Sequence, residues 1–380
     1  GSGNYMTRSL GAGKRELAEQ IVSIAFFTGI IMGLVITVSA TFNIHRVVLL
    51  LGATETIAPY AEAYAHYIFI AAPFMICSFI MNNLLRFQGK ASFAMVGITV
   101  GGLLNIALDP LFIFTLDMGT AGAALATGLS QFISFCILLW MCNHQDSCIS
   151  ISIRKFRPKL AIYREVLYGG IPSLGRQGIA SVATILMNFM CQPYGDAAIA
   201  AMSIVSRFMF FINSVIIGFG QGFQPVCSYC FGAGLYDRVK KACWFCIRVS
   251  TIILLVLSVI SFPAARSIIT LFRRNDPTVI EIGTLALRLQ LITLPLQGAV
   301  IMGNMMPQSI GYGFRATLVS TARQGIFLIP LLTIMTYTIG LLGIQCAQPL
   351  ADIATFILSL FVIRGIFKEF PEDASSFAAQ

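Results

Sequence analysis

Charged residues are scarce in this sequence, at 11% of 380 residues, and acidic residues are outnumbered by basic ones. Soluble globular domains carry about 25% charged residues, whereas here 57% of residues are hydrophobic and the mean hydropathy is +0.83. A soluble domain is therefore excluded. Disordered and fibrous chains are excluded too, because no low-complexity tract is present. The composition indicates a polytopic membrane protein with apolar segments long enough to cross a bilayer.

The sequence also lacks the motifs of common catalytic sites. It contains no HExxH zinc helix, Walker loop, GxSxG turn or paired-carboxylate cluster, and its three histidines are dispersed. We therefore predict that the protein is not an enzyme and has no cofactor. The net charge of +9 arises from basic residues in short loops, without any nucleic-acid motif. Nucleic acid is thus not an expected partner, and no signal peptide is visible.

Ten cysteines are present, mostly within apolar runs, where a free thiol behaves as a small hydrophobic side chain. Two pairs, Cys227 with Cys230 and Cys243 with Cys246, have a spacing that is also found in zinc sites. Both pairs lie at expected helix ends among apolar residues. We interpret them as packing residues, with a metal site as the minor alternative.

Ten membrane-spanning segments can be drawn from the apolar runs. Two GxxxG pairs within them, Gly29 with Gly33 and Gly97 with Gly101, predict close packing of helices. The expected spans are 17–50, 56–85, 91–116, 119–143, 162–191, 196–230, 236–262, 278–306, 313–338 and 341–367.

Basic residues in the loops and near the ends of the spans fall almost entirely on one side of the membrane. Sixteen lie on that side, and four lie on the other, namely Arg46, Arg266, Arg273 and Arg274. Because cytoplasmic loops carry the excess of lysine and arginine, the side with sixteen is predicted to be cytosolic. Both ends of the chain are then cytosolic.

One long polar segment, 144–160, separates two groups of spans. We predict an N-lobe over 1–143 with four helices, a cytosolic linker over 144–160, a C-lobe over 161–367 with six helices, and a cytosolic tail over 368–380. The linker is interpreted as solvated, with contact to anionic lipid as the alternative for its four basic residues.

An internal repeat relates the two groups of spans. The GAG motifs at 11–13 and 232–234 lie 221 residues apart. Gly89 and Gly311 lie 222 residues apart, as do Pro73 and Pro295. Both copies begin and end in the cytosol, so the repeats are parallel. The first copy has no counterpart of residues 161–221, which predicts a fold of 6+6 helices whose first two are absent here.

Several motifs then resemble a known family. They are NYMTRSLGAG (4–13), NIALDPLFIF (105–114), GTAGAALATGLSQ (119–131), GGIPSLGRQG (169–178), GDAAIAAMSIVSR (195–207) and GFGQGFQPVCSYCFGAG (218–234). Together they resemble the multidrug and toxic compound extrusion (MATE) family, in particular its bacterial branch, over essentially the whole chain. The resemblance implies an all-α fold of twelve helices in two lobes around a central cavity, with ten helices (4+6) present here. It also implies export of cationic or amphiphilic compounds, driven by inward flow of sodium ions or protons. The family's first helix carries an acidic residue important for coupling in many members, and that helix is not in this sequence.

Asp109 is the strongest candidate for a functional residue, because ionisable groups within membrane spans are costly. Asn105 lies four residues earlier on the same helical face. Pro110 cannot donate a backbone hydrogen bond to the carbonyl of Ile106. Carboxylate, amide and carbonyl oxygens suit a hard cation. Thr127, on the following span, lies at a similar depth across a short hairpin.

In the MATE family, an Asn and an Asp four residues apart and a Thr on the next helix help to form a cation site. The resemblance therefore implies that Asn105, Asp109 and Thr127 couple a cation, and that they are the metal ligands if the cation is Na⁺. The alternative is a structural Asp109 that caps or bonds a neighbouring helix. The matching part of the C-lobe, near Leu331, has no acid, so we expect coupling in the N-lobe alone.

The C-lobe spans are polar in a different way. Arg176 follows Pro172 near the start of a span, and we consider it a candidate for lining the cavity. The alternative is a structural ion pair, for which Glu165, about three helical turns away, is a possible partner. Our candidates for cavity-lining residues are Arg176, Gln177, Asn188, Gln297, Asn304 and Asp352.

These features predict a monomeric, multi-pass transporter of the bacterial inner membrane. The predicted function is secondary active, cation-coupled (Na⁺ or H⁺) export of amphiphilic or cationic compounds by alternating access. The alternative is a flippase for a lipid-linked precursor, from the same superfamily. Buried arginines favour the flippase, whereas Asp109 without an obvious basic partner argues against it.

Overall fold

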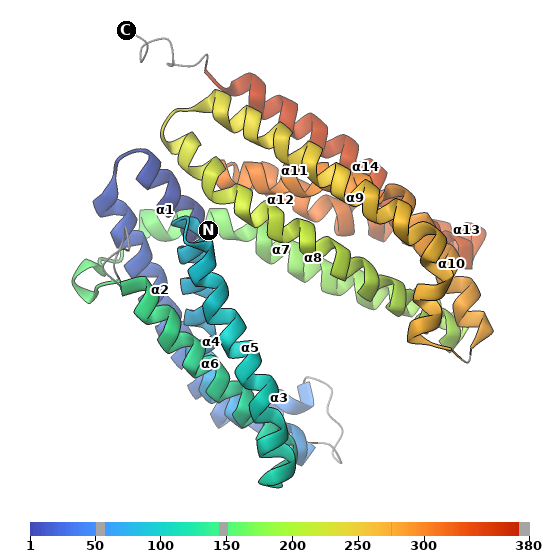
Figure 1. The fold of residues 1–380 in the computed structure, drawn as a ribbon, viewed down its shortest axis with the longest axis horizontal. Helices are drawn as coiled ribbons and strands as arrows, with labels where there is room; N and C mark the ends of the chain where they lie inside the picture. Colours follow the sequence, from blue (N-terminus) through green and yellow to red (C-terminus); the bar gives the residue numbers. More distant parts are fainter. Residues whose placement is uncertain (51–57, 144–150, 275, 372–380) are drawn as a thin grey trace. The chain divides into compact units, whose positions relative to one another are not determined.

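The computed structural model describes residues 1–50, 58–143, 151–274 and 276–371, and in these ranges every regular element is helical (Figure 1). The all-α fold class is therefore confirmed. The elements are α1 (Ser2–Gly11), α2 (Arg15–Phe42), α3 (Ile44–Leu50), α4 (Ala58–Phe87), α5 (Ala91–Pro110), η1 (Leu111–Thr115), α6 (Gly119–Asn143), η2 (Ile153–Lys155), α7 (Leu160–Cys191), η3 (Gln192–Tyr194), α8 (Asp196–Gly232), α9 (Tyr236–Phe272), α10 (Pro277–Thr293), η4 (Leu294–Leu296), α11 (Gln297–Ile310), α12 (Gly313–Thr321), η5 (Ala322–Leu328), α13 (Ile329–Ile339) and α14 (Leu341–Glu369).

Nine helical segments in the described parts are long and apolar enough to cross a membrane. The fifth expected span, 162–191, corresponds to α7, which carries Arg164, Glu165 and Arg176 and is not among these nine. The first expected span is shorter than predicted, because α2 ends at Phe42 and the short α3 follows.

Proline has different effects at equivalent positions of the two repeats. Pro295 lies in η4, where the long helix divides into α10 and α11, whereas Pro73 lies inside the continuous α4. A proline cannot donate a backbone hydrogen bond and its ring crowds the preceding turn. The two copies accommodate this strain in different ways.

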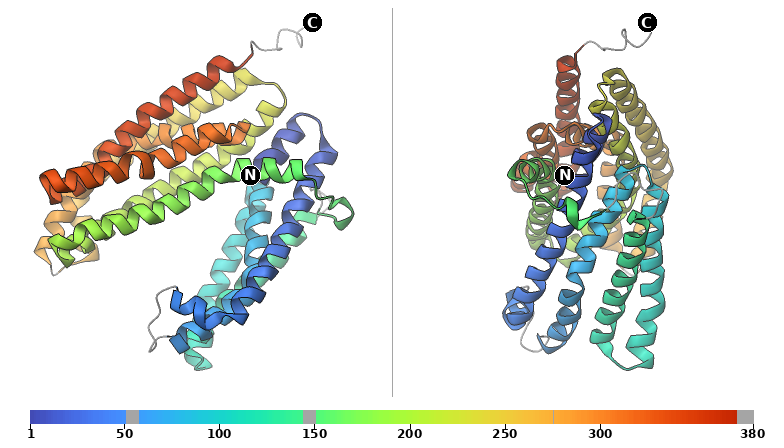
Figure 2. Two further views of the ribbon diagram at one scale, coloured as in Figure 1. Left: turned by 180° about the vertical axis from the view of Figure 1, so that it is seen from behind. Right: turned by 90° about the vertical axis from the view of Figure 1, so that its left-hand side faces the viewer.

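Residues 13–163 form one compact unit, in which α4 packs against α2, α5 and α6 (Figure 2, blue to green). The GxxxG glycines lie at these contacts, as predicted. A Cβ added at Gly33 would collide with Pro73, and one at Gly97 would collide with Leu138. Small residues thus allow the helices to approach closely, in place of a hydrophobic driving force that lipid cannot supply.

The second compact unit contains residues 3–12 and 164–380. A continuous apolar core joins α8 to α14 and includes Met202, Ile216, Leu254, Leu287 and Ile344, each at most 1% exposed. The predicted limits of the lobes stay a prediction, but in the described chain α1 makes its contacts with this second unit. Linker residues 144–150 and tail residues 372–380 lie outside the described residues.

The two repeats also match in their hydrogen bonds. Asn82 Nδ2 donates to the Ala94 carbonyl at 2.8 Å, and Asn304 Nδ2 donates to the Ala316 carbonyl at 2.9 Å. Both donors and both acceptors are 222 residues apart. The turn glycines agree as well, since Gly89 has φ +81° and Gly311 has φ +93°, a region that favours glycine. The parallel repeat inferred from spacing is therefore present in the structure.

Candidate functional site

The three residues predicted to couple a cation meet between α5 and α6. Asn105 Nδ2 lies 3.3 Å from Asp109 Oδ1 and 3.3 Å from Thr127 Oγ1. Thr127 in turn donates to the Ala123 carbonyl at 3.0 Å, which fixes the direction of its hydroxyl. All three side chains are half-buried. The amide of Asn105 thus bridges a carboxylate on its own helix and a hydroxyl on the next.

The helix that carries Asp109 changes its geometry directly after it. Pro110 ends α5, and the next five residues form the π-helix η1, in which Leu116 N–H bonds the Leu111 carbonyl at 3.0 Å. The Leu111 N–H goes to the Leu108 carbonyl. Neither Pro110 nor Leu111 therefore bonds the Ile106 carbonyl, which lies in the same turn as Asp109. Wide helical turns of this kind are frequent at functional sites.

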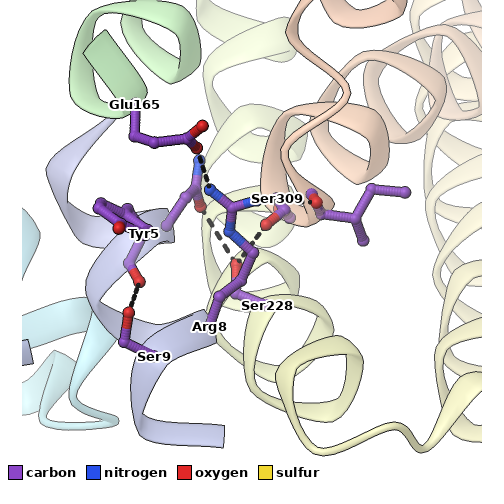
Figure 3. A network of polar contacts seen from close by, with 8 residues as sticks. Tyr5, Arg8, Ser9, Glu165, Ser228 and Ser309 are labelled. Carbon is purple, nitrogen blue, oxygen red and sulfur yellow. Dashed lines mark hydrogen bonds and ion pairs between the residues drawn. The ribbon is translucent and has the colours of Figure 1, made fainter. Parts of the chain in front are cut away.

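A second polar network surrounds α1 (Figure 3). Arg8 Nη1 donates to the Ile310 carbonyl at 3.0 Å, and Arg8 Nη2 lies 3.5 Å from Glu165 Oε2. Ser228 Oγ lies 3.3 Å from Asn4 Oδ1 and 3.2 Å from the Ser309 carbonyl. Arg8 therefore connects α1 to the end of α11 and to α7.

Glycines allow α1 and α8 to touch at the backbone. A Cβ at Gly11 would collide with the Tyr229 carbonyl oxygen, and a Cβ at Gly232 would collide with the Arg8 carbonyl oxygen. The contact is reciprocal, because Gly11 and Gly232 are repeat partners and so are Arg8 and Tyr229, 221 residues apart in both cases. The sequence motif GAG signalled the repeat but not this contact.

Asp352 is buried and paired. Its Oδ1 accepts from Arg323 Nε at 2.8 Å and from Gln348 Nε2 at 3.0 Å, and its side chain is 2% exposed. Arg323 lies in the π-helix η5, so each repeat has a π-helical segment beside a charged residue. The sequence pattern identified Asp352 as a candidate but did not predict its partner.

The remaining cavity candidates differ in their surroundings. Arg176 Nη1 donates to Asn304 Oδ1 at 3.3 Å. Its partner is therefore an amide, and Glu165, the partner considered in its alternative role, lies beside Arg8. Gln177 and Asn188 are exposed on α7. Gln297 is fully buried at the start of α11, and in the described part of the chain its amide atoms have no hydrogen-bond partner.

The cysteine pairs lie inside helices. Cys227 and Cys243 are fully buried, and both belong to the apolar core of their unit. Across the described residues, no three His, Cys, Asp or Glu side chains gather closely enough to hold a metal ion. The packing interpretation accounts for their position.

Comparisons with known proteins agree with this architecture. The MatE family model matches residues 1–111 and 172–334. Multidrug export protein MepA of Staphylococcus saprophyticus is 28% identical over 363 residues, which cover 96% of this chain and 80% of that protein. MepA of Staphylococcus aureus N315 is 29% identical over 366 residues, with the same shares of the two chains.

Solved structures show the same fold. An outward-facing multidrug resistance MATE family transporter of the MOP superfamily has a TM-score of 0.91 at 24% identity, covering 97% of this chain and 83% of that one. A MOP superfamily transporter from Pyrococcus furiosus, described as having a binding pocket of reversed polarity, has a TM-score of 0.90 at 25% identity, covering 98% and 83%. Since the family model matches more than half of its residues, the chain belongs to the MATE family of membrane transporters.

Proposed function

We propose that the protein is a multidrug exporter that exchanges amphiphilic or cationic compounds for Na⁺ or H⁺ through Asn105, Asp109 and Thr127. The observation that carries the proposal is the position of the Asn105 amide, 3.3 Å from both the Asp109 carboxylate and the Thr127 hydroxyl. The names of the MepA relatives support export of multiple drugs, and the family model supports transport.

The site as described holds an N–H group where a cation would bind. The amide of Asn105 offers hydrogen-bond donors to Asp109, which offset part of the carboxylate charge. A half-turn of the amide about its terminal torsion would replace these donors with the carbonyl oxygen. Asp109, Asn105 and Thr127 would then present three oxygens to one point, which suits a hard cation. The Ile106 carbonyl supplies a further oxygen in the same turn.

A proton acts on the same group by a different route. Protonation of Asp109 removes its charge and gives its carboxyl an O–H donor, which the turned amide oxygen of Asn105 can accept. Either ion therefore removes the cost of a bare carboxylate in a membrane span. A cationic drug that binds the same negative charge competes with the ion, so the site holds one or the other. Entry of the ion on one side therefore accompanies export of the drug on the other.

The proposal is tested by transport in liposomes. We expect a fluorescent lipophilic cation to leave wild-type proteoliposomes when a gradient of Na⁺ or H⁺ is imposed, and the effective gradient identifies the ion. Asp109→Asn keeps the shape of the side chain but not its charge, so gradient-driven export should fall to the level of empty liposomes. The matched control is Asp117→Asn, an exposed residue in the α5–α6 hairpin with φ +51°, where asparagine is tolerated.

Export that survives Asp109→Asn would assign Asp109 a structural role. A folded wild-type protein that exports no cation under any gradient would leave the flippase as the better reading. That result would be followed by an assay of lipid-linked precursor movement across the same vesicles.

A further inference from the structure

In the second unit, α10 packs against α9 and α14. A hollow of about 960 Å³ is lined by the end of α9 and by parts of α10 and α14. Its wall combines two arginines and a glutamate with apolar side chains. The lining residues are Arg266, Pro277, Ile280, Glu281, Ile282, Thr284, Leu285, Arg288, Leu341, Leu342 and Gln345. None of them belongs to the site proposed to bind the cation.

The position of this hollow relative to the bilayer follows from the charged residues of α9. Seventeen residues without charge, 249–265, separate Arg248 from Arg266. At about 1.5 Å per residue they span about 26 Å, close to the roughly 30 Å of a bilayer's hydrocarbon core. Arg266 therefore marks one edge of that core. The guanidinium of Arg288 lies 5.5 Å from the centre of the Phe262 ring, one turn deeper than Arg266.

The two guanidinium groups, of Arg266 and Arg288, have no carboxylate partner in the described part of the chain. Glu281 lies in the same wall, also outside any ion pair in that part. Two positive groups and one negative group thus face a hollow at the depth of the membrane interface, where arginines favour phosphate.

Apolar side chains continue the hollow towards the membrane. Leu285 is 43% exposed and Leu342 is 48% exposed, and both belong to helices that are apolar enough to cross a membrane. Such side chains provide a surface for an acyl chain directly beside the charged wall. A water-soluble anion would make no use of this surface.

We propose that the hollow binds one phospholipid whose headgroup carries both a phosphate and a primary ammonium. Arg266 and Arg288 bind the phosphate, Glu281 binds the ammonium, and the acyl chain lies against Leu285 and Leu342. The charges match in sign, because two arginines face the single phosphate and one glutamate faces the single ammonium. The apolar part of the wall matches a lipid rather than a free phosphate.

Native mass spectrometry of the detergent-purified protein tests this directly. The protein is titrated with phosphatidylethanolamine, phosphatidylglycerol, phosphatidylcholine and inorganic phosphate, and bound copies are counted. We expect a single copy of phosphatidylethanolamine to be retained best. Phosphatidylglycerol lacks the ammonium, and the ammonium of phosphatidylcholine cannot donate hydrogen bonds, so both should be retained less. Inorganic phosphate should not be retained.

Variants assign the charged groups. Arg288→Gln and Arg266→Gln should each weaken retention of phosphatidylethanolamine about tenfold, the size of one charge-assisted hydrogen bond. Glu281→Gln should instead abolish the preference for phosphatidylethanolamine over phosphatidylglycerol. The matched control is Arg274→Gln, since Arg274 lines a neighbouring hollow of about 350 Å³ together with Arg266 but not this one. Each variant is checked by its thermal unfolding midpoint.

Three results would overturn the proposal. Equal retention of the three lipids by the wild type would mean that the hollow has no headgroup preference. An equal loss with Arg274→Gln would mean that general positive charge, rather than this wall, attracts the lipid. Retention of inorganic phosphate alone would assign the arginines to a soluble anion and would likewise contradict a lipid site.

Discussion

Thr127 has a separable part in the site proposed to bind the cation. Its hydroxyl donates to the Ala123 carbonyl on its own helix and accepts from the Asn105 amide across the hairpin. These two bonds fix the orientation of the hydroxyl, so that a lone pair of its oxygen points towards α5. The methyl group of Thr127 takes no part in either bond, so hydroxyl and shape can be tested independently.

We predict that Thr127→Val raises the ion concentration needed for half-maximal export about tenfold, because one oxygen ligand is lost while the side-chain shape is kept. Thr127→Ser retains the hydroxyl and should stay close to wild type. The measurement is export from proteoliposomes as a function of the driving ion. Equal values for the two variants would remove Thr127 from the site.

Local spacing explains which parts of this site could be predicted from the sequence. Asn105 and Asp109 are four residues apart on one helix, so their contact follows from helical geometry alone. Thr127 required only a short hairpin between two spans. Arg8 and Glu165, by contrast, are 157 residues apart, and no periodicity connects them. For the same reason Glu165 was wrongly considered as a partner for Arg176.

At the scale of whole elements, the ion pair between Arg323 and Asp352 connects the start of η5 to α14. Asp352 is nearly inaccessible, while the Arg323 side chain is 22% exposed. Removing one partner of a buried pair leaves the other charge uncompensated, which is far costlier than replacing both by apolar residues. The pair should therefore stabilise the packing of these elements only as a unit.

Asp352→Asn should lower the free energy of unfolding by about 3 kcal/mol, whereas the double variant Arg323→Met/Asp352→Leu should recover most of that loss. Thermal unfolding in detergent measures both. Glu369→Gln serves as the comparison, because it removes the exposed partner of Arg315 and should change the midpoint little. A double variant as unstable as the single one would contradict this account.

Helix boundaries show where sequence patterns reach their limit. Hydropathy placed the spans, because long apolar runs must be helical in lipid. Hydropathy did not separate α10 from α11, or α12 from α13, because an apolar run has the same hydropathy whether its helix is continuous or interrupted. Pro73 and Pro295 illustrate this, because one proline lies inside a continuous helix and its repeat partner lies where the helix is divided.

Across the whole molecule, the uneven distribution of basic residues predicts the orientation in the membrane. The ends of α5 and α6 meet in a hairpin at Asp117, on the side with few basic residues. Arg238, at the start of α9, lies on the side with many. Both residues are exposed, so they report on the two sides of the bilayer.

We expect a membrane-impermeant maleimide to label intact cells that carry Asp117→Cys in a cysteine-depleted background. Cells that carry Arg238→Cys should be labelled only after permeabilisation, because positively charged loops remain in the cytosol. The reverse pattern would invert the predicted topology. Labelling of the cysteine-depleted background itself provides the baseline.

The reciprocal glycine contact has the form of an isologous interface, in which a segment meets its own copy. An ancestor that consisted of a single repeat would make the same contact as a homodimer, with one gene specifying both sides. After duplication each side mutates alone. The backbone contact of Gly11 and Gly232 has kept its symmetry, whereas one side now carries Arg8, bound to Glu165 and Ile310, and the other carries Tyr229. Fusion of the copies therefore allowed the halves to specialise without losing the contact that joins them.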